Sequence, residues 1–140
     1  MTATKRENIL SALVSALAPA EGVSGRIYRG RPYPARVEET PCIFVTWVND
    51  LPSYDNLNIM DWVLTFRVVI VTRDEAPDVA ADGILNSVHS LLMADRTIGN
   101  TVHDVLPAEQ RMSIIEGDNP VGLLEALYNV KYRTAQEAMT

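Results

Sequence analysis

The side chains best suited to chemistry are two histidines and one cysteine: His89, His103 and Cys42. His103 is followed directly by Asp104, and adjacent side chains on an extended chain point to opposite faces. A metal site would need a second histidine four residues away or carboxylates at ligand spacing. We therefore expect ordinary polar positions here and no metal. A small hydrolase or metal enzyme that uses His103, Asp104 and Asp95 is kept as an alternative.

Cys42 stands before Ile43 and Phe44 in an apolar run. Neither a helix start nor a run of cations lies close enough to lower its pKa, so we expect a small buried residue rather than a nucleophile. A single cysteine cannot form an intrachain disulfide, which favours a reducing compartment. The motifs Gly-x-Ser-x-Gly, Gly-x-x-x-x-Gly-Lys and Gly-x-Gly-x-x-Gly do not occur in the sequence. We predict no catalytic residue, no cofactor and no enzyme activity.

The composition is that of one globular domain. The chain has 140 residues, of which 47% are hydrophobic and 21% charged. This is enough to bury a core without disulfides, and it excludes a disordered chain. Apolar runs are too short to span a bilayer, and the first residues do not resemble a signal peptide. We expect a soluble intracellular domain over residues 1–140, with Ala135–Thr140 frayed.

The distribution of charge is more informative than its total. The chain carries 12 basic and 18 acidic residues, a net charge of −6, which disfavours nonspecific binding to DNA or anionic lipid. Residues 1–36 have a net charge of +4, so the rest carries −10. Two interpretations are open: both portions are solvated surfaces, or they are patches that meet on neighbouring copies of the chain. Arg26–Tyr33 also alternates cations with aromatics, as single-stranded nucleic acid binders do.

Two amphipathic helices are predicted. Thr4 and Glu7 have the spacing of a capping box, and apolar residues at helical spacing follow over Lys5–Ala18. Asp74–Asp78 places a proline and acids where a helix begins, and the apolar stripe that follows ends near Ala94.

The strands form the other half of the pattern. Side chains alternate over Trp62–Val71, where every second residue from Trp62 to Ile70 is apolar. The opposite side of this segment is only partly polar, so an assembly could cover it. Asn49–Met60 is predicted to be a long loop. The other expected strands are Arg26–Arg29, Cys42–Asn49, Thr101–Leu106, Arg111–Ile115 and Leu124–Arg133. The order predicts an α+β fold: a mixed, largely antiparallel sheet with two helices on one face.

In this order the segments resemble the phage tail terminator family, of which minor tail protein U of lambdoid phages is the type. The resemblance covers about residues 4–134, from the first helix onward. The segments that carry it are Val23–Pro34, Glu38–Val45, Trp62–Val71, the helix holding Ala81-Asp82 and Leu91-Leu92, and Ala126–Thr134.

The resemblance implies a structural virion protein that forms a six-fold ring. Such a ring caps the head-proximal end of the tail tube, ends tube polymerisation and offers the surface on which the head docks. The expected partners are copies of the chain itself, the tail tube protein and a head-completion or connector protein. Neither a membrane nor a specific nucleic acid is expected, and assembly would take place in the cytoplasm of the bacterial host. Another head–tail joining or tail-completion protein is the nearest alternative.

Charge and loop position together nominate the residues that would meet a neighbouring subunit or the tube. A ring needs one patch that fits a different patch on the next copy. The candidates are Arg26, Arg29, Arg31, Tyr33, Asp50, Tyr54, Asp55, Asp74, Glu75 and Asp78.

Overall fold

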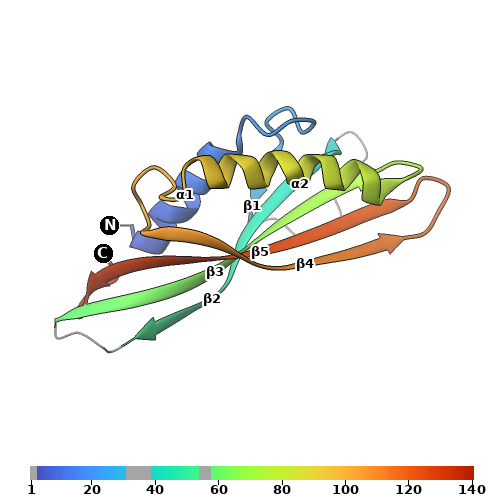
Figure 1. The fold of residues 1–140 in the computed structure, drawn as a ribbon. Coiled ribbons are helices and arrows are strands. Elements are labelled where there is room, and N and C mark those ends of the chain that lie inside the picture. Colours follow the sequence, from blue (N-terminus) through green and yellow to red (C-terminus); the bar gives the residue numbers. More distant parts are fainter. Residues whose placement is uncertain (1–2, 31–38, 54–57) are drawn as a thin grey trace.

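A computed structural model describes residues 3–30, 39–53 and 58–140. Within them the chain forms two helices and one five-stranded sheet (Figure 1). Neither helix is long and apolar enough to cross a bilayer. In chain order the elements are α1 (Lys5–Leu17), β1 (Ile27–Arg29), β2 (Cys42–Ser53), β3 (Ile59–Arg73), α2 (Pro77–Ala94), β4 (Asp104–Ile115) and β5 (Val121–Ala135).

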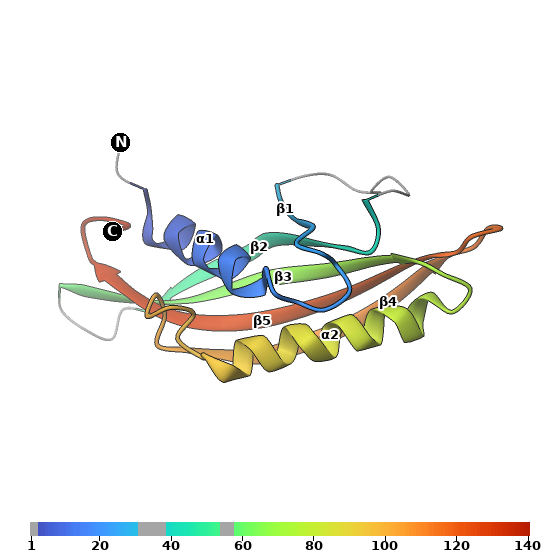
Figure 2. The same ribbon diagram turned by 90° about the horizontal axis from the view of Figure 1, so that it is seen from above.

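The sheet has the order β1-β2-β3-β5-β4. β1 pairs with β2 in parallel, and every other neighbouring pair is antiparallel. Both helices lie on the same face of the sheet (Figure 1). Seen from above, α1 lies on the β1–β2 side and α2 on the β4–β5 side (Figure 2). The predicted α+β class, with two helices on one face of a mixed and largely antiparallel sheet, is confirmed.

The main core lies between the helices and this face of the sheet. The alternation predicted in β3 is confirmed, because Leu64, Phe66, Val68 and Ile70 all point into this core and are fully buried. Phe66 stacks on Tyr128 of β5 with 5.5 Å between ring centroids. The core is completed by residues of the two helices and β5, among them Ile9, Leu13, Ile84, Val88, Ala126 and Val130.

Both helices begin where their sequence predicts. The Thr4 hydroxyl accepts a hydrogen bond from the Glu7 backbone N–H at 3.1 Å, which satisfies one of the amides that a helix start leaves free. α2 begins at Pro77, whose fixed φ suits a first turn.

A second, smaller apolar cluster lies on the other face of the sheet. It consists of Cys42, Phe44, Val69, Val71 and Val121. Cys42 is fully buried in it, as predicted. The segment Val68–Val71 of β3 therefore packs against apolar residues on both faces of the sheet.

The prediction of a loop over residues 49–60 is wrong at both ends. β2 continues to Ser53 and β3 begins at Ile59, and the two pair as far as Ser53 with Asp61. Pro52 and a break in register between Trp47 and Asn49 interrupt the alternation of side chains that would have predicted a strand here. Proline is tolerated because a strand edge does not need its missing N–H.

The two short strands predicted around Pro107 are one strand. β4 runs without interruption over Asp104–Ile115, with a shift in register between Pro107 and Glu109. Thr101–His103 precede it rather than belong to it. A bulge lets an edge strand absorb a proline and an extra residue without ending.

The two ends of the chain lie side by side at one end of the sheet (Figure 1). The Lys5 backbone N–H donates to the Met139 carbonyl at 2.8 Å, and the Gln136 N–H donates to the Asn58 carbonyl at 3.2 Å. The last residues, for which fraying is predicted, thus make two backbone hydrogen bonds.

Candidate interface surfaces

β4 forms one lateral edge of the sheet, and it is unusually exposed. Every residue from Leu106 to Ile115 is exposed to solvent. Its partner β5 is different, because every second side chain there is buried. The pairing with β5 places Met112 and Ile114 on the helix side and Ile115 on the opposite side. Four large apolar side chains of this strand are therefore exposed to solvent: Leu106 (41%), Met112 (36%), Ile114 (48%) and Ile115 (52%).

The opposite lateral edge is formed by β1 and the outer half of β2. β1 pairs only with Ile43–Val45, so among the described residues the remainder of β2 has a single strand neighbour, β3. Trp47, Val48 and Leu51 are 42%, 40% and 60% exposed along this outer half. Arg6 of α1 lies over the Trp47 ring, 4.1 Å from its centroid, which is a favourable cation–π contact.

Asp50 lies inside the subunit rather than on the predicted loop. Its side chain is only 4% exposed, and its Oδ2 accepts a short hydrogen bond from the Tyr132 hydroxyl. Arg6 Nη1 lies 3.4 Å from the same oxygen. Burial and the Asp50 carboxylate raise the pKa of Tyr132 well above its ordinary value. The predicted interface charge is thus used to join β2, β5 and α1.

Arg26 and Arg29 also have partners within the chain. Arg26 Nε donates to the backbone carbonyls of Glu39 at 3.1 Å and Pro41 at 2.9 Å. Arg29 forms a two-point ion pair with Glu7, with N–O distances of 2.6 and 2.9 Å. The Arg29 guanidinium lowers the pKa of the Glu7 carboxyl. Of the other candidates, Arg31, Tyr33, Tyr54 and Asp55 lie outside the described residues.

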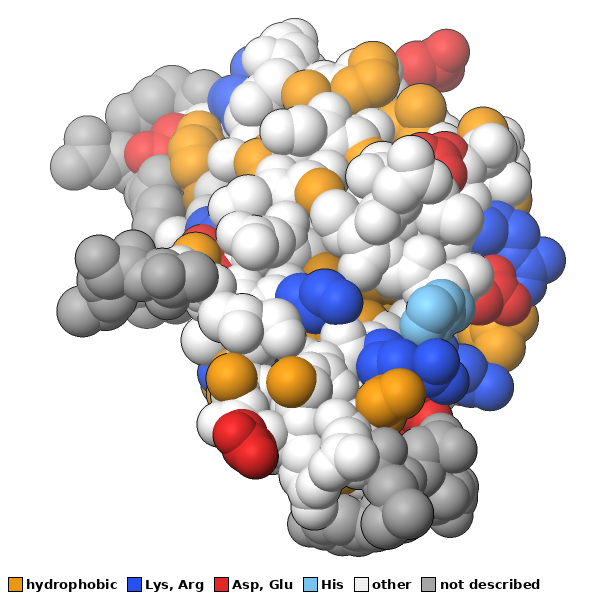
Figure 3. Space-filling view, turned by 90° about the vertical axis from the view of Figure 1, so that its left-hand side faces the viewer, with side chains coloured by type: hydrophobic (Ala, Val, Ile, Leu, Met, Phe, Trp, Pro, Cys, Tyr) orange, Lys and Arg blue, Asp and Glu red, His pale blue; other side chains and the backbone are white. Residues whose placement is uncertain are grey.

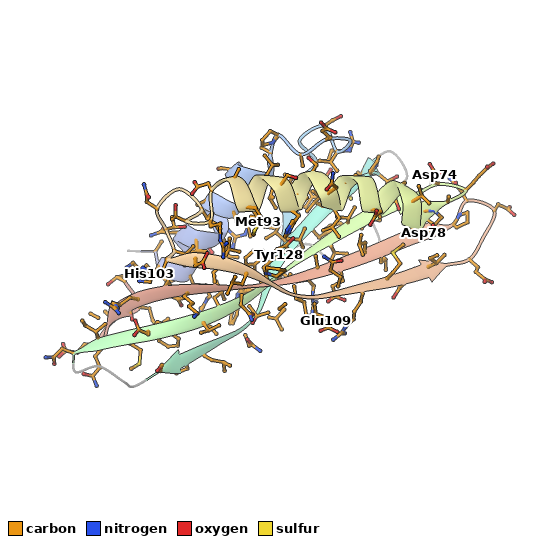
Figure 4. All side chains as sticks on the ribbon, viewed as in Figure 1. Asp74, Asp78, Met93, His103, Glu109 and Tyr128 are labelled. Atoms are coloured by element: carbon orange, nitrogen blue, oxygen red, sulfur yellow. The ribbon has the colours of Figure 1, made fainter. Side chains whose placement is uncertain are left out.

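An acidic end is formed where α2 begins and the β4–β5 turn closes. Asp74, Glu75 and Asp78 are exposed there, and Figure 4 shows Asp74 and Asp78 beside the tip of the β4–β5 hairpin. The Asp74 N–H donates to the Pro120 carbonyl at 3.3 Å, which brings the two turns together. Two exposed acids of the second turn, Glu116 and Asp118, therefore join the cluster.

Glu116 and Asp118 were missed as candidates by sequence reasoning. Glu116 precedes the Gly117–Pro120 turn signal and Asp118 lies within it, but nothing in the sequence indicates that this turn lies beside the residues before α2. That proximity follows from the sheet order, which places β5 between β3 and β4.

The opposite end of the sheet, where the two chain ends lie, carries mixed charge. Figure 3 shows lysine and arginine side chains gathered around a histidine on this end, with acids among them. A cavity of about 640 Å³ opens here, and its lining includes Lys5, Asn8, His103, Tyr132 and Arg133. These groups come from three segments, and the described residues that line the cavity include no Asp or Glu to act beside His103.

The carboxylates proposed for a hydrolytic site have other roles. Asp104 makes a two-point ion pair with Arg96 at 2.7 and 3.0 Å, which lowers its pKa. Asp95 accepts hydrogen bonds from Thr97 and Gly99 in a turn, and its pKa is also lowered. Both carboxylates are thus engaged by partners within the subunit. No group of three or more His, Cys, Asp or Glu residues in the described chain could hold a metal ion.

His89 supports the core from the margin of α2. Its Nδ1 lies 3.1 Å from the hydroxyl of Tyr128, which is fully buried. Figure 4 shows Tyr128 between α2 and the sheet. A buried tyrosine hydroxyl needs a polar partner, and His89 supplies it.

On the face of the sheet without helices, polar and charged side chains pair with one another. Arg67 lies 2.6 Å from Glu125, Arg133 lies 2.7 Å from Asp61, and the Thr65 hydroxyl is 2.7 Å from Asn129 Oδ1. Each pair bridges β3 and β5. Within the described strands, the exposed large apolar side chains are therefore found at the two lateral edges rather than in the middle of this face.

The comparisons with known proteins bear on the fold. No protein-family model matches this chain, and no curated protein matches it in sequence. A chain in a solved structure of the virion of a native gene transfer agent particle has the same architecture, with a TM-score of 0.63. The match covers 89% of this chain and 94% of that chain at 10% sequence identity. It therefore shows a shared fold over nearly the whole length of both.

Proposed function

We propose that this protein is a structural subunit of a phage-like virion. The observation that carries the proposal is the likeness of its fold, over nearly its whole length, to a chain of a gene transfer agent virion. The surfaces support a role in assembly, because the largest exposed apolar side chains include those at the two lateral edges of the sheet. A subunit that joins its own copies through two different edges can form a closed ring.

Within the virion we propose the tail terminator role: a ring of six copies at the head-proximal end of the tail tube. The ordered resemblance over residues 4–134 supports this position, as does the separation of a basic N-terminal stretch from an acidic remainder. The ring would end polymerisation of the tube protein and present a docking surface to a head-completion or connector protein.

Deleting the gene from its phage or prophage tests the role directly. We expect overlong tails in electron micrographs, because nothing would stop growth of the tube. Normal-length tails without heads would instead assign the chain to head–tail joining. Unaltered virions would contradict a structural role altogether. A plasmid copy of the wild-type gene should restore tail length and serves as the control.

Reconstitution tests the ring itself. The purified protein, mixed with the tube protein of the same virion, should yield a closed oligomer by native mass spectrometry and capped tube ends by negative-stain microscopy. A chain that stays monomeric at every concentration, with tubes that continue to grow, would contradict the proposal.

A further inference from the structure

The second half of β4 is a strand edge without the usual protection. Natural proteins guard exposed edges with short strands, prolines, bulges or charges. β4 has its proline and its register shift at Pro107–Glu109, so Gln110–Ile115 follow without either. The one charged side chain among these six residues, Arg111, is paired with Glu109 at 2.8 Å. Met112, Ile114 and Ile115 lie exposed on the same segment.

We infer that this segment of β4 pairs with the outer half of β2 of a second copy of the chain, so that the sheet continues from one subunit to the next. The inference deepens the proposed ring and rests on it. Among the described residues, β1 covers β2 only as far as Val45, and Thr46–Leu51 is the segment that we assign to a neighbour. On the helix side the exposed Trp47 offers an apolar match to Met112 and Ile114, and on the other face the exposed Leu51 offers one to Ile115.

The distribution of charge favours β2, rather than a second β4, as the strand that pairs with β4. Residues 74–118, which contain α2 and β4, hold nine acidic and two basic residues, a net charge of −7. Two β4 edges brought together would place these charges against each other. The described part of the N-terminal stretch, residues 3–30, holds four basic and two acidic residues, a net charge of +2, and its α1 and β1 lie beside β2 (Figure 2). Only the contact between unlike edges joins opposite charges.

The pairing also accounts for how the two edges differ. Contacts between one edge and a different edge of the next copy repeat around a closed ring, whereas contacts between identical edges end at a dimer. The free edge of β2, Thr46–Leu51, lies between the end of its pairing with β1 at Val45 and Pro52. It has six residues, as many as the unguarded segment Gln110–Ile115 of β4.

Engineered cysteines test the contact. Ser113 is exposed on the face without helices, and Thr46, Asn49 and Leu51 lie on that face of β2. We would combine Ser113→Cys in turn with Thr46→Cys, Asn49→Cys and Leu51→Cys, which samples the register. Within one chain β3 and β5 separate the two positions by about 14 Å, too far for a disulfide. The native Cys42 is buried and stays in all variants.

After mild oxidation in the presence of the tube protein, we expect at least one pair to give a ladder of cross-linked species up to the full ring on a non-reducing gel. Ser113→Cys paired with Ser90→Cys, an exposed position on α2, should give none. A ring seen by native mass spectrometry without cross-links in any of the three pairs overturns the inference and leaves the proposed function standing.

Two other outcomes are equally informative. Covalent dimers from Ser113→Cys alone would show pairing of β4 with β4 and overturn the inference. Failure of every variant and of the wild type to form any oligomer with the tube protein overturns the proposed function, and the inference with it.

A lysine on the edge provides a second measurement. Ile114→Lys should raise the concentration needed for half-assembly at least tenfold, because a charged side chain blocks strand addition. Its melting temperature should match the wild type, since Ile114 is already 48% exposed. Ser90→Lys is the control and should assemble normally. Normal assembly of Ile114→Lys would overturn the inference.

Discussion

β3 and β4 belong to one sheet and are separated only by β5, yet their side chains have opposite surroundings. β3 has a strand on each side, and its residues from Val68 to Thr72 are buried on both faces. β4 has one strand neighbour, and it is exposed from Leu106 onward. Apolar residues in β3 thus stabilise the subunit, whereas Met112, Ile114 and Ile115 of β4 contribute little to it. The difference separates residues kept for folding from residues available for assembly.

The largest expected effect is at the centre of β3. Phe66→Ala should lower the free energy of unfolding by about 3–5 kcal/mol, because it empties a fully buried site stacked on Tyr128. Ile114→Ala on β4 should change it by no more than about 0.5 kcal/mol. Urea denaturation of the two variants measures the contrast. Equal losses would mean that β4 is covered within the subunit.

The second effect compares two carboxylates. Asp50→Ala removes the acceptor of the buried Tyr132 hydroxyl, and we expect a loss of about 1–3 kcal/mol. Asp61→Ala breaks the exposed pair with Arg133, which should cost no more than about 1 kcal/mol. Thermal unfolding at neutral pH separates them. A smaller loss for Asp50→Ala than for Asp61→Ala would contradict the buried role of Asp50.

A third contrast uses two glycines near the acidic end. A Cβ on Gly122 would lie 2.8 Å from Pro77 Cβ and 2.8 Å from Thr72 Oγ1, so Gly122→Ala should cost about 1–3 kcal/mol through overpacking. A Cβ on Gly117 meets nothing within 4 Å, and Gly117→Ala is the matched control with little effect. Melting temperatures suffice to compare them. An unchanged Gly122→Ala would show that α2 is free to move away from β5.

The smallest effect concerns the ion pair at the β1 edge, whose contribution to stability depends on pH. The ion pair with Arg29 lowers the pKa of Glu7 in the folded chain. The stabilisation is therefore complete above the pKa of an unfolded glutamate, about 4.3, and is lost as pH falls through the lower folded pKa. Unfolding of the wild type and of Glu7→Gln between pH 3 and 7 measures it. We expect their difference to shrink in acid; a constant difference would argue against the pair.

The contrast between β3 and β4 also explains what could be predicted from the sequence. β3 alternates because one of its faces meets the helices, so its pattern in the sequence is clear. In β4 neither face is covered after Val105, and the spacing of its apolar residues carries no signal. The same holds for the outer half of β2, where Pro52 and the bulge imitate a loop.

The candidate interface was harder to predict than the fold. The sequence predicts Asp50 to lie on a loop, although its strand turns it toward Tyr132. Arg29 is a candidate for the interface because of its charge, although the packing of α1 brings Glu7 to it. Such pairings connect residues far apart in the chain, and composition alone does not reveal them. The acidic residues at the start of α2, Asp74, Glu75 and Asp78, are exposed, and their place in an interface stays a prediction.

The hydrogen bond between Lys5 and Met139 has a practical consequence. Because the two ends of the chain emerge together, opposite the acidic turns, a tag fused to either one marks the same end of the subunit. In images of assembled tails, the extra density would lie on one side of the subunit only. A fusion at that end therefore offers a way to orient each copy without disturbing the strands that we expect to join.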